Sequence, residues 1–105
     1  MHKQEEIIKN FLTQLGYSND AILIYIGLIK EGPSTLLQIS KKCKLERTKL
    51  YRLIEDFIKN GIVEEVPAYK RKTVKAVDLN TIEFLVRKKL SDANSLNDNF
   101  SFFSD

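Results

Sequence analysis

Basic side chains gather in residues 41–75, where they could do one kind of chemistry, the neutralisation of phosphates. This stretch holds eleven lysines and arginines and five acidic residues, a local charge of +6. The whole chain carries +3, so the remaining residues together carry −3. A concentrated basic region binds nucleic acid by releasing counterions from the phosphates, whatever the base sequence. The plainer interpretation is that the charges only solvate exposed helix faces. The order of the surrounding elements favours nucleic-acid binding instead.

Two short helices carry the first part of this basic region. Ser34 or Thr35 can cap a helix that ends near Cys43, because a hydroxyl oxygen accepts hydrogen bonds from the free N–H groups of a first turn. A second helix over residues 46–60 repeats apolar residues on one face and ends at the C-cap pair Asn60-Gly61. The opposite face of this second helix is polar and mostly basic.

A β-hairpin follows the two helices. Residues 62–66 and 73–77 are rich in β-branched residues, and the loop between them, residues 67–72, ends in three basic residues. Two short helices followed by such a hairpin are typical of a winged helix-turn-helix. We therefore predict an α+β, mostly helical fold: a three-helix core with a β-hairpin wing and extra helices at the N- and C-terminal ends.

Helices are also expected on both sides of this motif. Residues 3–15 have the apolar spacing of an amphipathic helix, and Ser18 can cap another that runs to Lys30 or Glu31. A chain of 105 residues can bury one core, so residues 1–90 are predicted to form a single domain.

The C-terminal region has two interpretations. A last helix starts at Asp78 or Asn80, and residues 91–105 either extend it or fray, since they are rich in Asn, Asp and Ser. A heptad-like spacing predicts a homodimer seam along this helix. The seam residues are Ile82, Val86, Leu96, Phe100 and Phe103. The alternative is that Ile82, Leu85, Val86 and Leu90 pack on their own domain while the aromatic residues close over its core.

Several functional classes are disfavoured by the composition. One cysteine, Cys43, and one histidine, His2, cannot build a disulfide or a metal cluster, so we expect no metal and no cofactor. Cys43 is expected to pack as a small apolar residue, with a redox-sensing thiol as the alternative. The sequence shows no nucleophile-base pair and no Gly-rich phosphate loop, so we expect no enzyme, and it indicates no small-molecule ligand. The longest apolar run, residues 21–29, is about half a membrane span, and no secretory signal is visible, so a cytoplasmic location is predicted.

A series of short segments follows one order and spacing along residues 12–90. They are Leu15-Gly16-Tyr17-Ser18, Tyr25, Leu28, Gly32-Pro33, Ile39, Arg47-Thr48-Lys49-Leu50-Tyr51 and Asn60-Gly61-Ile62-Val63-Glu64. In this series the chain resembles the TrmB-like transcriptional regulators, and specifically their N-terminal winged helix-turn-helix domain. The resemblance implies DNA binding and transcription regulation. Winged helix families of the MarR and ArsR type share parts of the pattern and are alternatives, as are basal transcription factor modules with the same fold.

Three features depart from the TrmB-like pattern. Ala21-Ile22-Leu23 replaces a charged stretch and predicts a helix buried on more than one face, either at a subunit interface or clamped by the terminal helices. Lys44 stands where the turn between the motif helices usually has Gly. A left-handed lysine would cost on the order of 1 kcal/mol, so either the turn differs or the strain is tolerated. The larger family members continue into a sugar-binding domain that this sequence does not include, so sugar sensing is not expected here.

The resemblance and the helix pattern together predict the residues that contact double-stranded DNA. In a helix-turn-helix the N-terminal part of the second helix lies against base edges in the major groove. Base readout is predicted for Arg47, Thr48, Lys49, Tyr51 and Arg52. Tyr51 has a rival role, packing on the preceding helix. Contacts to the DNA backbone are predicted for Ser34, Thr35, Lys41, Lys42 and, in the wing, Lys70, Arg71 and Lys72.

The predicted function is sequence-specific binding to double-stranded DNA by a transcriptional regulator that forms a homodimer through its terminal helices. The alternative is a winged helix that binds another protein, with charges that only confer solubility. Acidic residues within the motif keep this alternative open, since a carboxylate that faced a phosphate would repel it. Glu55 and Asp56 sit late on their helix, and Glu64 and Glu65 lie at the base of the hairpin, so most of these acids are expected to face away from DNA.

Overall fold

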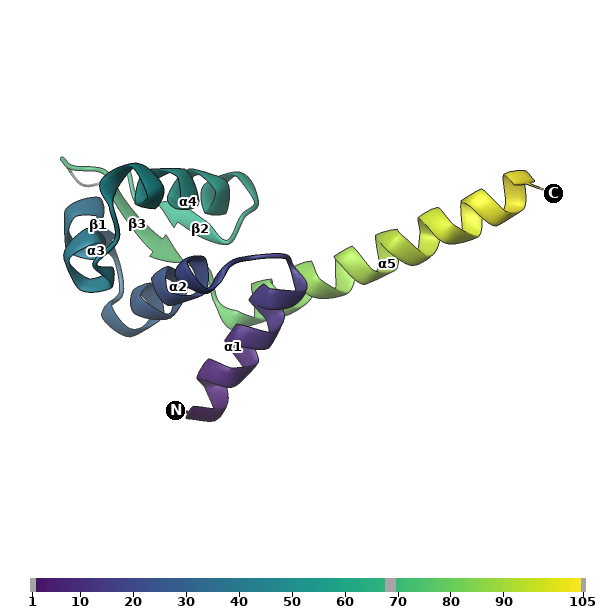
Figure 1. Ribbon diagram of the computed structural model, residues 1–105, viewed down its shortest axis with the longest axis horizontal. Coiled ribbons are helices and arrows are strands. Elements are labelled where there is room, and N and C mark those ends of the chain that lie inside the picture. The colour runs from purple at the N-terminus through teal and green to yellow at the C-terminus, as the bar shows by residue number, and fades with distance from the viewer. Residues whose placement is uncertain (1, 68–69, 105) are drawn as a thin grey trace.

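The described residues form five helices and a three-stranded sheet, which confirms the predicted fold class. The computed structural model describes the backbone of residues 2–67 and 70–104 and the side chains of residues 3–67 and 70–92. In chain order the elements are α1 (His2–Gln14), α2 (Asn19–Glu31), β1 (Ser34–Thr35), α3 (Leu36–Cys43), α4 (Arg47–Lys59), β2 (Val63–Glu65), β3 (Thr73–Ala76) and α5 (Leu79–Ser104). Figure 1 shows a body built from α2 to β3, with α1 beside the first turns of α5 and the rest of α5 leading away. No helix among the described residues has the length and apolar character that a membrane span requires.

Helix α2 lies at the centre of the body and packs against α1, α3 and β3. Ala21 and Ile22 are buried, as the apolar pattern predicts, whereas Leu23 is 54% exposed. The predicted clamp by both terminal helices is only half right, because α1 covers α2 while α5 packs mainly on α1. The third side of α2 is covered by the motif helix α3 instead.

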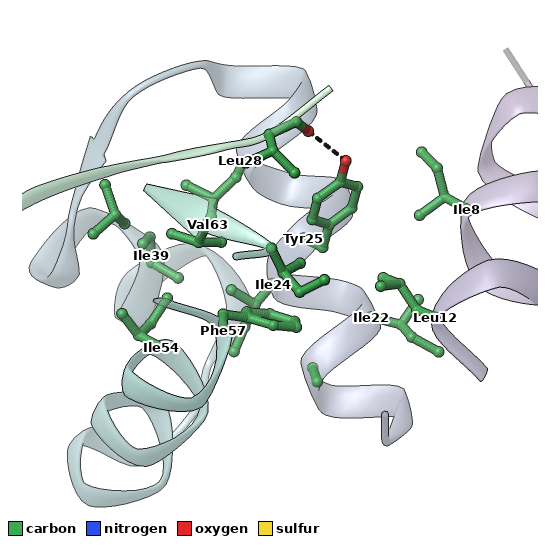
Figure 2. Packing of buried hydrophobic residues seen from close by; sticks show 14 of the residues in the cluster. Ile8, Leu12, Ile22, Ile24, Tyr25, Leu28, Ile39, Ile54, Phe57 and Val63 are labelled. Carbon is green, nitrogen blue, oxygen red and sulfur yellow. Dashed lines mark hydrogen bonds between the residues drawn. The ribbon is translucent and has the colours of Figure 1, made fainter. Parts of the chain in front are cut away.

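The core joins the N-terminal helix to the motif helices. Leu12 of α1, Ile24 and Tyr25 of α2 and Phe57 of α4 are fully buried, and Figure 2 shows the last three within one cluster and Leu12 at its edge. The Tyr25 hydroxyl donates a 2.6 Å hydrogen bond to the carbonyl of Val77, drawn as a dashed line in Figure 2. This bond ties α2 to the chain just before α5 begins.

The sheet is antiparallel with β3 in the middle, in the order β1-β3-β2. The predicted hairpin is confirmed, with strands slightly shorter than predicted. Strand β1 was not predicted: Ser34 and Thr35 pair with Val74 and Thr73, and two residues are too few to show an alternating pattern. This extra pairing fastens the start of α3 to the wing.

Capping side chains fix where the helices begin. Ser18 Oγ accepts from the backbone N–H of Ala21 at 3.3 Å, which confirms the predicted cap of α2. Thr35, rather than Ser34, caps α3. The Asp78 carboxylate accepts from the N–H and the hydroxyl of Thr81, and these hydrogen bonds hold the pKa of Asp78 below its usual value. Asp78 therefore precedes α5 as its capping residue, and Asn80 lies inside the helix.

Helix α5 runs without a break from Leu79 to Ser104. Ile82 and Val86 are buried within their own domain, so the predicted seam is wrong for these two residues: a second chain cannot reach side chains that this chain already covers. Leu90, which the alternative places on the domain, is 57% exposed. The other predicted seam residues, Leu96, Phe100 and Phe103, lie outside the side chains that the structure describes.

Candidate nucleic-acid interface

Helix α4 presents a polar face at its N-terminal end and buries the opposite face. Leu50, Ile54 and Phe57 are fully buried in the core, so they fix the rotation of the helix. The first two turns then leave a set of polar side chains in solvent, and these are the residues predicted for base readout. They are Arg47, Thr48, Lys49, Tyr51 and Arg52, all exposed.

Tyr51 belongs to the exposed side chains of α4. Its side chain is 44% exposed and does not belong to the residues packed against the core. The side chain is therefore accessible to a partner, and the rival role, packing of the ring on the preceding helix with the hydroxyl outward, stays a prediction.

The turn between α3 and α4 contains the strained residue that the sequence suggested. Lys44 has φ 54° and ψ 39°, the left-handed conformation, so the turn keeps its usual shape and the lysine bears the strain. Two hydrogen bonds hold it: the Lys44 N–H donates to the carbonyl of Ser40 at 2.9 Å, and the Ser40 hydroxyl donates to the carbonyl of Leu45 at 3.2 Å. These contacts hold the turn that joins α3 to α4.

Two of the residues predicted to contact the DNA backbone have other tasks at the start of α3. Ser34 is only 7% exposed and its hydroxyl donates to the carbonyl of Gly32 at 2.9 Å, so its burial does not fit a phosphate contact. Thr35 forms a capping box with Gln38, in which each side chain accepts from the other residue's backbone N–H. Lys41 and Lys42, at the other end of α3, are exposed.

The wing carries its basic residues at the N-terminal end of β3. Lys70, Arg71 and Lys72 are exposed. The Thr73 hydroxyl donates to the carbonyl of Arg71 at 3.0 Å, and the N–H of Val66 donates to the carbonyl of Thr73 at 2.8 Å. These bonds secure the base of the loop against the hairpin.

Three lysines of this surface form ion pairs with carboxylates of the same chain. The pairs are Lys42–Glu31, Lys49–Asp20 and Lys72–Glu55. These pairs could not be predicted from the sequence, because partners far apart in the chain meet only after folding. For Glu55 the expectation was wrong, since this acid lies beside a wing lysine and not away from the basic surface.

The remaining basic residues of the surface are not engaged in this way. Among the described residues, the ion pairs do not include Lys41, Arg47, Arg52, Lys70 or Arg71. The basic surface is therefore divided into paired and unpaired cations.

Cys43 belongs to the edge of the core. It is half-buried and packs against the core cluster, and burial raises the pKa of its thiol, with Lys42 acting in the opposite direction. A raised pKa leaves less of the reactive thiolate at neutral pH, which favours the packing interpretation. Cys43 also lines a pocket of about 200 Å³ between α2 and α3, smaller than the usual size of small-molecule sites, roughly 300 to 1,000 Å³.

Similarity to known proteins agrees with this arrangement. Residues 12–80 match the family described as sugar-specific transcriptional regulator TrmB. No curated protein matches the chain in sequence. Among solved structures, the chain is similar to a possible transcriptional regulator from Methanosarcina mazei Go1, with 17% identity, a TM-score of 0.71, and coverage of 98% of this chain and 90% of that one.

Two further structures show the same fold. TrmBL2, an archaeal chromatin protein whose structure shows a novel mode of DNA binding, has 12% identity and a TM-score of 0.80, and this chain spans 40% of its length while 99% of this chain is covered. The oxidized form of MarR from E. coli has 17% identity and a TM-score of 0.59, with 91% of this chain and 74% of that chain covered. Since the family match extends over most of the winged helix, the chain belongs to the TrmB family and is a DNA-binding transcriptional regulator.

Proposed function

We propose that this chain binds duplex DNA sequence-specifically, with α4 in the major groove and the wing, residues 67–72, on the DNA backbone or the adjacent minor groove. The carrying observation is the two-faced α4, which exposes a mostly cationic set of side chains while its apolar face is locked in the core. A helix held in this way keeps its exposed side chains in fixed places, which base readout requires. A regulator acts where the DNA lies, so a cytoplasmic location remains part of the proposal.

Base discrimination is assigned to the exposed residues at the start of α4. Arg47 and Arg52 have no carboxylate partner among the ion pairs of the described residues, so their guanidinium groups are available for bidentate bonds to guanine O6 and N7. Such a pair supplies about 1 to 3 kcal/mol of discrimination. Thr48 suits a thymine methyl group, and the exposed ring of Tyr51 suits a base or sugar edge.

Contacts to the DNA backbone are assigned to cations on both sides of α4. Lys41 and Lys42 lie in the last turn of α3, and Lys70, Arg71 and Lys72 lie in the wing. Phosphate contacts fix the register of a protein on the duplex without reading its sequence. Ser34 is left out because it is buried, and Thr35 because its side chain already caps α3.

A salt titration with a charge-matched control tests this surface. Binding of wild type to a random-sequence duplex is expected to weaken linearly in log salt. Changing Arg47, Lys49 and Arg52 together to Ala is expected to weaken binding by more than about tenfold. The control changes Lys9, Arg87 and Lys88 to Ala, which removes the same charge from α1 and α5, and should alter affinity by no more than about twofold. Binding that is absent at low salt, or that responds equally to both triple changes, would sink the proposal and favour a protein-binding module.

We further propose that the chain forms a homodimer through the distal part of α5. Figure 1 shows this part of the helix leading away from the body without a neighbouring element. In the sequence, Leu96, Phe100 and Phe103 continue the spacing that Ile82 and Val86 begin. A single helical segment of this length is marginal in water, so an apolar stripe beyond the body calls for a partner helix.

Removal of residues 91–105 tests the homodimer. Wild type is expected to sediment with twice the mass of one chain, and the shortened chain with the mass of one. The shortened chain should keep the thermal unfolding of the domain, because Ile82 and Val86 remain in the core. A wild type that sediments as a single chain at tens of micromolar concentration would exclude this interface.

A further inference from the structure

Three acidic residues form ion pairs with lysines of the proposed DNA surface in the free protein. We call Asp20, Glu31 and Glu55 the masking acids. Their partners are Lys49 in the first turn of α4, Lys42 in the last turn of α3 and Lys72 in the wing. All three partners belong to the cations assigned above to DNA, and each lies on a different element of the motif.

The positions of the masking acids are not explained by local helix stability alone. Glu31 is the last residue of α2, where the helix dipole disfavours a carboxylate, so its favourable interaction there comes from Lys42. The Glu55 side chain is 62% exposed and lies on α4 opposite the buried face, next to the wing lysine. Asp20 suits the first turn of α2 and in addition reaches across to α4.

A paired lysine contributes less to DNA binding than a free one. A phosphate that takes the lysine must displace the carboxylate, and an exposed ion pair of this kind corresponds to a factor of roughly two to five in an equilibrium constant. The displaced carboxylate then lies close to a polyanion and repels it. A lysine already neutralised by a carboxylate also releases fewer counterions from the DNA, which flattens the salt dependence.

We propose that the masking acids compete with DNA phosphates for Lys42, Lys49 and Lys72 and thereby restrain sequence-independent binding. This inference rests on the proposed function. The unpaired Arg47 and Arg52 are not subject to the competition, so the base contacts assigned to these two arginines stay available. Binding to non-specific DNA is essentially electrostatic. Weaker electrostatic attraction therefore reduces binding to non-specific DNA more than binding to specific sites, where base contacts also contribute.

Neutralisation of the masking acids tests the competition on a random-sequence duplex across a salt series. Each single change, Asp20→Asn, Glu31→Gln or Glu55→Gln, is expected to tighten binding by about two- to fivefold. The triple variant is expected to gain at least about tenfold, and its salt slope should steepen by up to about 2.7 for three unmasked lysines. Far-UV circular dichroism melts check that the variants are folded.

A control triple separates local competition from net charge. Asp56→Asn, Glu64→Gln and Glu83→Gln also remove three negative charges. Among the described ion pairs, Glu64 is paired with Lys75, Glu83 with Arg87, and Asp56 with no lysine. This variant is expected to gain no more than about twofold, with an unchanged salt slope. An equal gain in both triple variants would show a general charge effect and overturn the inference.

A double-mutant cycle locates the effect at one pair. Asp20→Asn should tighten binding when Lys49 is present and should have only the control-sized effect in a Lys49→Ala background. Weaker binding after neutralisation would mean that the carboxylates position the lysines for DNA, and that outcome also overturns the competition. Absence of binding by both wild type and the unmasked triple would instead remove the proposed function itself, whereas wild-type binding without any gain in the triple removes only this inference.

Discussion

At the scale of single residues, Lys44 shows how the motif overrides a local preference. The sequence left open whether the turn changes its shape or the lysine tolerates the strain, and the structure shows a left-handed lysine, with φ 54°. The structure keeps the turn and places a lysine in the strained state. The requirement for one angle between α3 and α4 therefore outweighs the preference of the residue.

Substitution of Lys44 by Gly is expected to stabilise the protein by about 0.5 to 1 kcal/mol. The gain is the relief of left-handed strain, about 1 to 2 kcal/mol, less the conformational entropy that glycine loses on folding, about 0.5 to 1 kcal/mol. Urea unfolding measures the difference. Lys44→Ala removes the same charge but keeps a Cβ atom, so it should bring no gain, and equal stability of the two variants would argue against strain.

The buried hydrogen bond of Tyr25 is a second residue whose effect can be measured. Tyr25→Phe leaves the Val77 carbonyl without its donor, and an unsatisfied buried acceptor costs about 1 to 3 kcal/mol. The matched control, Tyr51→Phe, changes a hydroxyl on an exposed ring and should leave urea unfolding unaltered. A Tyr25→Phe protein as stable as wild type would contradict the assigned role of this bond.

Alkaline pH should weaken the fold through two tyrosines. Burial, assisted by Asp78, raises the pKa of Tyr25 above its usual value, and burial is also the largest cause that raises the pKa of Tyr17 to about 12. Because the pKa of each tyrosine is higher in the folded state than in the unfolded state, the neutral hydroxyl stabilises the folded protein fully below the unfolded pKa of 10.0. This stabilisation is lost as the pH rises from 10.0 towards the folded-state pKa. We expect the melting temperature to fall between pH 10 and 12 and the fall to be shallower in Tyr25→Phe. An equal fall in both proteins would exclude a contribution from Tyr25.

The residues of the candidate site were only partly predictable. Arg47, Thr48 and Arg52 were found because a helical period places them opposite a buried apolar face, and the structure exposes them. Asp20 and Glu31 were missed because their pairing with lysines depends on how α2 packs against the motif. Local sequence patterns show which face of a helix is exposed, but they do not show which side chains of other elements lie beside that face.

At the scale of elements, the helices were predictable because interactions between residues close in the sequence determine where they begin and end. Ser18 caps α2 through a bond three residues away, and β-branched residues mark the hairpin strands. Strand β1 was not predictable, since its two residues have strand geometry only because β3 lies beside them. Local signals fixed the helices, and tertiary pairing fixed the third strand.

Gly27, inside α2, offers a test of element stability. A Cβ atom at this position would meet only Cys43 Sγ, at 4.0 Å, an ordinary contact. Gly27→Ala is therefore expected to stabilise the protein by about 0.8 to 1 kcal/mol, the difference in helix propensity. The opposite sign is expected for Gly61→Ala, because Gly61 has φ +77° and alanine would be strained there by about 1 to 2 kcal/mol. Loss of stability in Gly27→Ala would contradict the open packing at this site.

At the scale of the whole molecule, the apolar spacing of α5 extends beyond the residues that the domain itself buries. Its first members, Ile82 and Val86, complete the core beside α1, and the same spacing continues where the helix has left the body. The sequence pattern alone could not separate these parts, because a stripe packed on its own domain and a stripe packed on a second chain have the same period. The structure shows that the domain buries Ile82 and Val86, and packing of the later members on a second chain stays a proposal.

The most direct measurement of the central claim is a map of backbone amide shifts in ¹⁵N-labelled protein during titration with a random-sequence duplex at low salt. We expect the largest changes for residues 47–52 at the start of α4, with smaller changes for residues 41–42 and 70–72 and almost none for residues 3–14 of α1. Changes confined to α1 and α5, or a spectrum that does not respond to DNA, would contradict the assignment of the basic helix and wing as the DNA-binding surface.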